Sequence, residues 1–153
     1  MIRPMFWGMN TVKEYILAAL LGLTSLAAQA QTPPLVPVAA SEIVLADLLY
    51  QKRIVAIFAD SPEDPVFLRQ MALLTVNPGD LQDRDVIVVF DFNPAQPSEL
   101  RKKLRPKGFS LVIMDKDGKI ALRKPLPWDT REISRTIDKF PSRRDEVLLE
   151  SGL

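Results

Sequence analysis

Residues 60–64 are the part of this sequence whose side chains are best placed to do chemistry. The segment Asp60-Ser-Pro-Glu-Asp64 carries three carboxylates and one hydroxyl. It lies between an apolar run that predicts a buried strand and a helical pattern, a position where α/β proteins commonly bind ligands. Ser61 and free backbone N–H groups could bind a small anion, although the acids would repel it. Alternatively, Asp60, Glu63 and Asp64 could bind a hard cation such as Ca²⁺ through oxygen ligands.

A structural role for the same residues is the favoured interpretation. Ser61 could cap the helix with Pro62 at its first position and Asp64 three residues on, or Asp64 could cap it with Pro65 at the first position. Side-chain caps are common at helix starts, and the remaining acids would interact favourably with the helix dipole.

Two residue types that are common in catalytic and metal sites are missing from this sequence. The chain has no Cys and no His, which excludes disulfides, thiol chemistry, Ser-His-Asp triads and the usual zinc sites. The alternative to a binding protein is a hydrolase-type or cation-dependent enzyme that uses Asp60, Ser61 and Glu63, with a carboxylate or Lys as its base. We assign no catalytic residue and expect no metal and no cofactor.

A second acidic group surrounds the next apolar run and consists of Asp80, Asp83, Asp85 and Asp91. Paired carboxylates held across a cleft can do acid–base or glycosidic chemistry. These acids instead flank a turn and a strand edge, with Arg84 among them, so we interpret them as solvated turn residues.

A basic run, Arg101-Lys-Lys-Leu-Arg-Pro-Lys107, could dock an acidic partner, a lipid headgroup or polyphosphate. It contains no aromatic residue for base stacking, and the net charge of the chain is only +1, so nucleic acid is not expected as a partner. A solvated helix face is favoured for this run and for the pair Arg143-Arg144. Trp128 lies among prolines in a predicted loop, where it packs at the core edge or lines a partner groove.

The N-terminal residues predict export. Lys13 precedes an apolar run from Tyr15 to Ala28, and Ala28-Gln-Ala30 follows as a small-x-small cleavage signal. The run is too short for a comfortable membrane span, and no later segment is long enough. We therefore expect a signal peptide cleaved after Ala30, a periplasmic or secreted location, and no stable membrane insertion after cleavage.

Hydrophobic periodicity predicts the order strand, helix, strand, helix, strand, hairpin strand, helix. The predicted strands are 53–59, 85–92, 109–114 and 119–123. One predicted helix begins in the 60–65 segment, and the other two cover 98–104 and 130–140. The first helix should pack Phe67, Leu68, Met71 and Leu74 on the sheet. The first two crossovers predict parallel neighbours, and Asp117-Gly118 predicts an antiparallel hairpin.

Changes in composition divide the chain into four regions. They are a signal peptide at 1–30, an extended proline-rich lead-in at 31–40, a folded domain at 41–146 and a charged tail at 147–153. From Pro141 onward we expect the charged chain to be only partly ordered.

The order of elements resembles the thioredoxin-like fold. Val55-Ala-Ile-Phe58 is similar to its first core strand, and Asp115-Lys-Asp-Gly-Lys-Ile120 is similar to its hairpin. Glu63-Asp-Pro-Val66 stands where a redox thioredoxin has Cys-Gly-Pro-Cys, with the proline kept and both cysteines replaced. The place of the fold's cis-proline falls near Gly108 and Phe109, so that residue is also lost.

The chain is also similar to an exported bacterial family known only as domain of unknown function 4174. The resemblance covers roughly Ile43 to Glu146 and is carried by residues 57–65, 83–89, 108–118 and 141–144. It implies an α/β, thioredoxin-like domain with a central mixed sheet of about four strands flanked by helices, a C-terminal β-hairpin and a closing helix. The family brings no settled activity.

Together these features predict an exported, redox-inactive, thioredoxin-like binding module of the bacterial cell envelope. The expected partner is an unknown envelope protein or a small ligand, and the chain is expected to be a monomer. The candidate binding residues are Asp60, Ser61, Glu63, Asp64 and Trp128.

Overall fold

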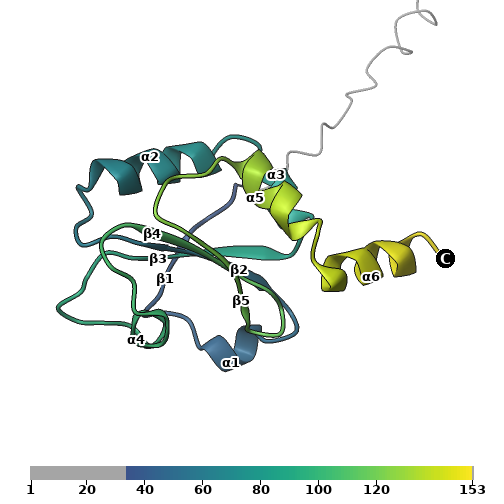
Figure 1. The fold of residues 1–153 in the computed structure, drawn as a ribbon, viewed down its shortest axis with the longest axis horizontal. Helices are drawn as coiled ribbons and strands as arrows, with labels where there is room; N and C mark the ends of the chain where they lie inside the picture. Colours follow the sequence, from purple (N-terminus) through teal and green to yellow (C-terminus); the bar gives the residue numbers. More distant parts are fainter. Residues whose placement is uncertain (1–33, 153) are drawn as a thin grey trace, which may run out of the picture. The chain divides into compact units, whose positions relative to one another are not determined.

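The apolar run after Lys52 forms strand β2 (Arg53–Phe58) at the centre of a mixed sheet in the computed structural model, which describes residues 34–152. All six residues of β2 are buried, because helices cover both faces of the sheet (Figure 1). The strand order is β1-β3-β2-β4-β5. The sheet therefore has five strands rather than about four, and the extra one is β1 (Val38–Ala39), which lies in the predicted lead-in and pairs with β3.

The other elements follow the predicted order. The remaining strands are β3 (Val86–Asp91), β4 (Ser110–Met114) and β5 (Ile120–Lys124). The helices are α1 (Leu45–Leu48), α2 (Pro65–Leu74), α3 (Gly79–Gln82), α4 (Glu99–Leu104), α5 (Thr130–Ile137) and α6 (Pro141–Glu150).

The direction of β4 differs from the prediction. β2 and β3 are parallel, as expected, but β4 runs antiparallel to β2. The end of β3 and the start of β4 lie at the same edge of the sheet, because Phe58 pairs with Asp91 on one side and with Ser110 on the other. The segment that contains α4 therefore does not have to return the chain to the opposite edge, and a parallel crossover is not required. The predicted β4–β5 hairpin is antiparallel and is confirmed.

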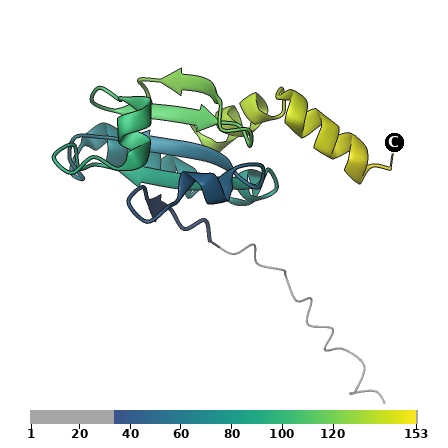
Figure 2. The same ribbon diagram turned by 90° about the horizontal axis from the view of Figure 1, so that it is seen from below.

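Alternate residues of the central strands supply two separate cores. One face of the sheet packs Val55, Ile57 and their neighbours against α2, α3 and α5. The other face packs Ile54, Ala56 and Phe58 against α4 and α1, and these two helices lie in front of the sheet in Figure 2. This division explains why the strands read as continuous apolar runs rather than alternating ones.

The inward face of α2 is shifted from the predicted one. Phe67 and Leu74 are buried as expected, whereas Leu68 is 53% exposed. Gln70 takes the third inward position and is fully buried. A polar residue is tolerated there because its amide is satisfied by the loop that precedes α5.

The charged chain after Phe140 is helical, which corrects the expectation of a partly ordered tail. Pro141 stands at the first position of α6, where proline is favoured. None of the α6 residues is buried, so polar contacts rather than core packing hold this helix. The predicted domain limit at 146 falls inside α6.

The predicted signal peptide and its cleavage site after Ala30 lie outside the described residues. Within residues 34–152 no helix is long and apolar enough to cross a membrane.

Candidate functional site

The predicted binding loop lies at the carboxyl edge of β2. Phe58 ends the strand, Ala59 is fully buried, and the chain becomes exposed at Asp60. The same edge carries the end of β3 and the start of β4. Side chains from three strand ends therefore converge near the loop, as expected for a site in an open α/β sheet.

Asp64, not Ser61, caps α2. The Asp64 carboxylate accepts hydrogen bonds from the backbone N–H groups of Val66 at 2.8 Å and Phe67 at 3.4 Å, and Pro65 is the first helical residue. Of the two caps that the sequence allowed, the second is therefore the one formed. The N-terminal N–H groups of α2 are partly used by this cap, which leaves fewer of them for an anion.

Ser61 and Glu63 interact with each other rather than with the helix. The Ser61 hydroxyl donates a hydrogen bond to the Glu63 carboxylate and accepts one from the Glu63 backbone N–H at 3.1 Å. The hydroxyl lowers the pKa of Glu63 below its usual value of 4.5. A carboxylate with a lowered pKa is a weaker base, so the contact does not favour Glu63 as the base of a Ser61 nucleophile.

The loop rests on a buried ion pair. The Arg101 Nε donates to the Asp91 carboxylate at 2.9 Å, and the two side chains are 8% and 6% exposed. The Arg101 Nη2 also donates to the backbone carbonyls of Ala59 and Asp91. Its Nη1 lies 3.8 Å from the Asp60 carboxylate. Arg101 therefore ties the end of β2, the end of β3 and the first residue of the loop together.

This ion pair corrects two predictions. Arg101 was expected on a solvated helix face and Asp91 among solvated turn residues, yet both are buried. Leu104 lies three residues after Arg101 on the same side of α4 and is also buried, so Arg101 lies on the inward face. The three-residue spacing from Leu104 was the sequence signal that could have placed Arg101 on the inward face. The identity of the carboxylate partner could not be read from it.

Asp91 remains ionised inside this network. Burial alone would raise the pKa of Asp91, but hydrogen bonds from the Ser98 hydroxyl and the Asn93 N–H, together with the Arg101 charge, bring it below its ordinary value. Ser98 also caps α4 by accepting from the Arg101 N–H. A cavity of about 210 Å³ lies beside Asp91 and Ser98, which is smaller than most ligand pockets.

Trp128 is held against the middle of α2. The Gln70 side-chain amide donates to the Trp128 carbonyl and accepts from its N–H, both at 2.8 Å. The Lys124 ammonium lies 4.7 Å from the centroid of the Trp128 ring, a cation–π distance. The ring is half-buried against the core. Trp128 is thus positioned beside α2, whereas residues 60–64 precede that helix.

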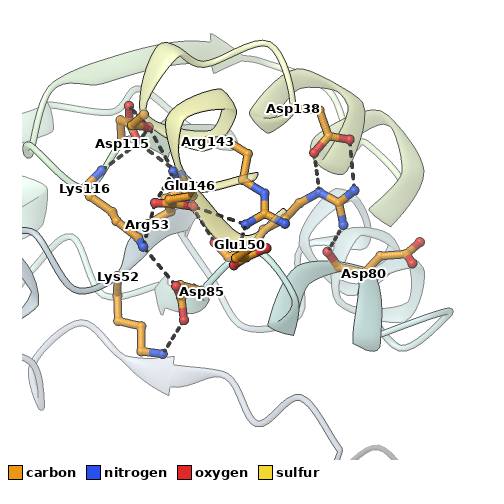
Figure 3. A network of polar contacts seen from close by, with 12 residues as sticks. Lys52, Arg53, Asp80, Asp85, Asp115, Lys116, Asp138, Arg143, Glu146 and Glu150 are labelled. Atoms are coloured by element: carbon orange, nitrogen blue, oxygen red, sulfur yellow. Dashed lines mark hydrogen bonds and ion pairs between the residues drawn. The ribbon is translucent and has the colours of Figure 1, made fainter. Parts of the chain in front are cut away.

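The second acidic group of the sequence does not gather at one place in the fold. Asp85 comes just before β3 and Asp91 ends it, so the second acidic group is divided between the two edges. Figure 3 shows Asp85 between Lys52 and Lys116, whose ammonium groups lie 3.2 and 2.9 Å from its carboxylate. Asp80 lies apart from Asp85, near Asp138 in the same view, and its backbone carbonyl accepts a hydrogen bond from Arg84. Asp85 is therefore held in two ion pairs rather than in an open catalytic pair.

A network that the sequence did not indicate occupies the edge of the sheet opposite the 60–64 loop. Arg53, the first residue of β2, is 0% exposed and contacts both Asp115 and Glu146 (Figure 3). Burial would raise the pKa of Glu146, but hydrogen bonds from Arg53, Lys116 and Arg143 outweigh it and lower the pKa from 4.5 to about 2. The network attaches α6 to the sheet, so its role is structural.

Metal binding by the acidic loop is not favoured by its geometry. In the described part of the chain no group of three or more carboxylates is arranged to hold a metal ion. Asp64 is used as a cap and Glu63 is bonded to Ser61. The loop is therefore an exposed acidic segment that Arg101 holds at its start, through Ala59 and Asp60.

Comparison with known sequences identifies the family. The family model called Domain of unknown function (DUF4174) matches residues 44–146. The chain belongs to the DUF4174 family. The match spans α1 through the first turns of α6, including the Arg101–Asp91 pair and most of the Arg53 network. No functionally curated protein matches the sequence.

The solved structure of a thioredoxin shows that this DUF4174 domain has a thioredoxin-like fold. Chloroplastic thioredoxin z is similar over 71% of this chain and 95% of its own, with a TM-score of 0.50 and 18% identity. Thioredoxin peroxidase I of Plasmodium yoelii covers 67% of this chain and 80% of its own, with a TM-score of 0.48 and 15% identity. At these identities the likeness concerns the fold alone.

The predicted fold class and family are therefore confirmed. The DUF4174 domain has the thioredoxin-like arrangement, and none of the 153 residues of the chain is Cys. Thiol–disulfide exchange is excluded because it requires a thiolate.

Proposed function

We propose that this protein is an exported binding module of the cell envelope, with a thioredoxin-like fold and no thiol chemistry. The observation that carries the proposal is the acidic loop at the carboxyl edge of β2. Asp60 is 62% exposed at the side chain and Glu63 is exposed, yet both make defined contacts with other side chains. A loop fixed before binding loses less conformational entropy when a partner docks.

The charge of the loop indicates the chemistry of its partner. Asp60 and Glu63 present two carboxylates to solvent, and the cation below them, Arg101, is buried. A basic or polar surface of an envelope protein, or a small cationic ligand, is complementary to this loop. Trp128, half-buried beside α2, would supply an apolar contact at the margin of such an interface.

The test is affinity capture from an envelope extract, at low and at high salt, with the variant Asp60→Asn/Glu63→Gln. Asp64 is left intact because its replacement would remove the α2 cap and confuse loss of binding with loss of stability. The matched control is Glu42→Gln/Asp145→Asn, which removes the same two charge types at exposed positions outside the loop.

One stoichiometric protein retained at high salt by the unmodified protein and by the control, but lost by the loop variant, supports the proposal. Recovery of only salt-sensitive background, or equal loss in both variants, contradicts a specific site at this loop.

Export has a separate test. We expect mass spectrometry of protein recovered from the envelope fraction to give an N-terminus at Gln31. Recovery of the intact N-terminus in the cytoplasmic fraction would overturn the export part of the proposal and leave the binding part to be judged on its own.

A further inference from the structure

A basic pocket lies at the start of β4, on the same edge of the sheet as the acidic loop but built from other residues. It has a volume of about 400 Å³ and is lined by Arg105, Lys107, Phe109, Ser110, Arg123 and Pro125. Three of these six residues are cations, and none is an acid. This composition contrasts with the other charged clusters of the domain, in which acids and bases are paired.

Among the described residues, no carboxylate pairs with any of the three cations. Within residues 34–152 every ion pair involves other basic residues, namely Lys52, Arg53, Arg84, Arg101, Lys116, Lys119 and Arg143. Arg105, Lys107 and Arg123 are exposed. Like charges gathered in one pocket repel each other, and a bound anion would relieve that repulsion.

The backbone places these residues around the end of α4 and the start of β4. Arg105 ends α4 in the left-handed region, with φ of 47° and ψ of 56°, a conformation that is uncommon for a residue with a side chain. Gly108, at φ of 57°, makes a second such turn before β4. The Arg123 Nη2 donates to the Leu104 carbonyl at 2.7 Å, which anchors Arg123 beside the end of α4.

A nearly buried serine in the lining of the pocket supplies the second observation. Ser110 is only 5% exposed and lines the pocket. Its hydroxyl makes no hydrogen bond to any residue between 34 and 152. A hydroxyl that no neighbouring residue engages is free to donate a hydrogen bond to a ligand oxygen in the pocket. The negative end of the α4 dipole accounts for cations near Arg105, but it does not account for this hydroxyl.

We propose that this pocket binds a phosphate-bearing ligand. The planar guanidinium of arginine matches the geometry of phosphate oxygens, lysine adds a point charge, and the Ser110 hydroxyl donates one more hydrogen bond. Phe109 and Pro125 also line the pocket. The site goes beyond the proposed function, since none of its residues belongs to the 60–64 loop or is Trp128.

The first experiment titrates the ¹⁵N-labelled protein with inorganic phosphate, against sodium chloride at equal ionic strength. We expect saturable amide shifts at Phe109 and Ser110. The variant Arg105→Gln/Lys107→Gln should weaken binding about tenfold or more, because it removes two charge-assisted hydrogen bonds. Neither side chain makes a contact that the fold requires.

The matched control is Lys102→Gln/Lys103→Gln, which removes the same charge from the exposed face of α4 outside the pocket. It should leave the affinity within about twofold, and Ser110→Ala should weaken binding without changing net charge. Sedimentation with vesicles of phosphatidylglycerol or of phosphatidylcholine distinguishes a lipid headgroup from a free phosphate.

Saturable binding of phosphate or of phosphatidylglycerol vesicles that is lost in the Arg105/Lys107 variant supports the site and identifies the source of the ligand. The proposal would be overturned if neither phosphate nor the phosphatidylglycerol vesicles bound saturably. It would also be overturned if the Lys102/Lys103 control lowered the affinity as much as the Arg105/Lys107 variant does. These variants leave Asp60 and Glu63 intact, so failure here is distinguishable from failure of the binding-loop proposal.

Discussion

Arg53 and Glu146 are 93 residues apart in the sequence and form a bidentate ion pair. Nη1 and Nη2 of Arg53 donate to the two carboxylate oxygens of Glu146 at 3.0 and 2.9 Å. Arg53 is fully buried at the start of the central strand, and Glu146 lies on α6, which has no buried residue of its own. Two parallel charge-assisted hydrogen bonds therefore connect the last helix to the centre of the sheet.

Glu146→Gln should lower the free energy of unfolding by about 2–3 kcal/mol at neutral pH, because the buried Arg53 charge loses one of its two carboxylate partners. Urea denaturation followed by circular dichroism would measure the change. Glu150→Gln is the control. Glu150 is 69% exposed and 3.8 Å from Arg143, so its replacement should cost less than about 0.5 kcal/mol. If the two substitutions lowered the free energy of unfolding by the same amount, the Arg53–Glu146 contact would not be the cause of the stabilisation.

The same pair predicts the pH dependence of stability. The pKa of Glu146 is lowered in the folded state from 4.5 to about 2, so its contribution is complete above pH 4.5 and is lost as the pH falls toward 2. The shift corresponds to about 3 kcal/mol. Between pH 7 and pH 3, the unmodified protein should lose more stability than Glu146→Gln, measured by urea midpoints. A constant difference between the two proteins would be the contrary result.

Arg101→Met should destabilise the domain by about 3–5 kcal/mol, because the substitution leaves the Asp91 carboxylate buried without its cation. It should also raise the pKa of Asp91, which is now held low partly by Arg101. Chemical denaturation and carboxyl NMR titration would measure the two effects. Lys102→Met, at the adjacent exposed position, should change stability by no more than about 0.5 kcal/mol.

Asp64→Ala should cost about 1 kcal/mol, within the usual range for loss of a helix cap, because the N–H groups of Val66 and Phe67 lose their acceptor. Ser61→Ala should be almost neutral, since the Ser61 hydroxyl bonds to Glu63 in an exposed loop and the backbone is unchanged. Thermal denaturation of both variants tests the assignment. A larger loss for Ser61→Ala would favour the cap that the structure does not form.

Gln70→Leu should lower stability by about 2 kcal/mol, because the N–H and carbonyl of Trp128 would both lose their partner. Hydrogen exchange of the Trp128 amide should accelerate as well, and Arg69→Leu, at the neighbouring exposed position of α2, serves as the control. Unchanged exchange in Gln70→Leu would show that the loop is fixed by other contacts.

Local patterns accounted for most elements. The β-branched runs predicted β2, β3 and β4, and Ile133 and Ile137 are buried in α5 as the predicted closing helix requires. Two segments were missed or misjudged. Strand β1 is only two residues long, too short to show a period, and α6 has no apolar face buried on the sheet, so its charged sequence resembled a solvated tail.

The candidate site was predicted in position but only partly in its contacts. Residues 60–64 lie at the carboxyl edge of β2 because a strand followed by a helix start places them there, which is a local property. The partners Arg101 and Asp91 come from two other elements. Nothing in the spacing of a basic helix distinguishes the cation that faces inward to a buried carboxylate from the cations that face water.

The sequence by itself determined that this protein cannot do thiol chemistry, since it has no Cys, and it determined the order of elements and the family resemblance, because these depend on residue type and local period. Only the tertiary structure decided which charges are neutralised. Arg53 and Arg101 became buried ion pairs, while Arg105, Lys107 and Arg123 gathered around one pocket without an acid. The energy of a charge depends on burial and on the groups within a few ångströms, and the fold brings those groups together from distant parts of the chain.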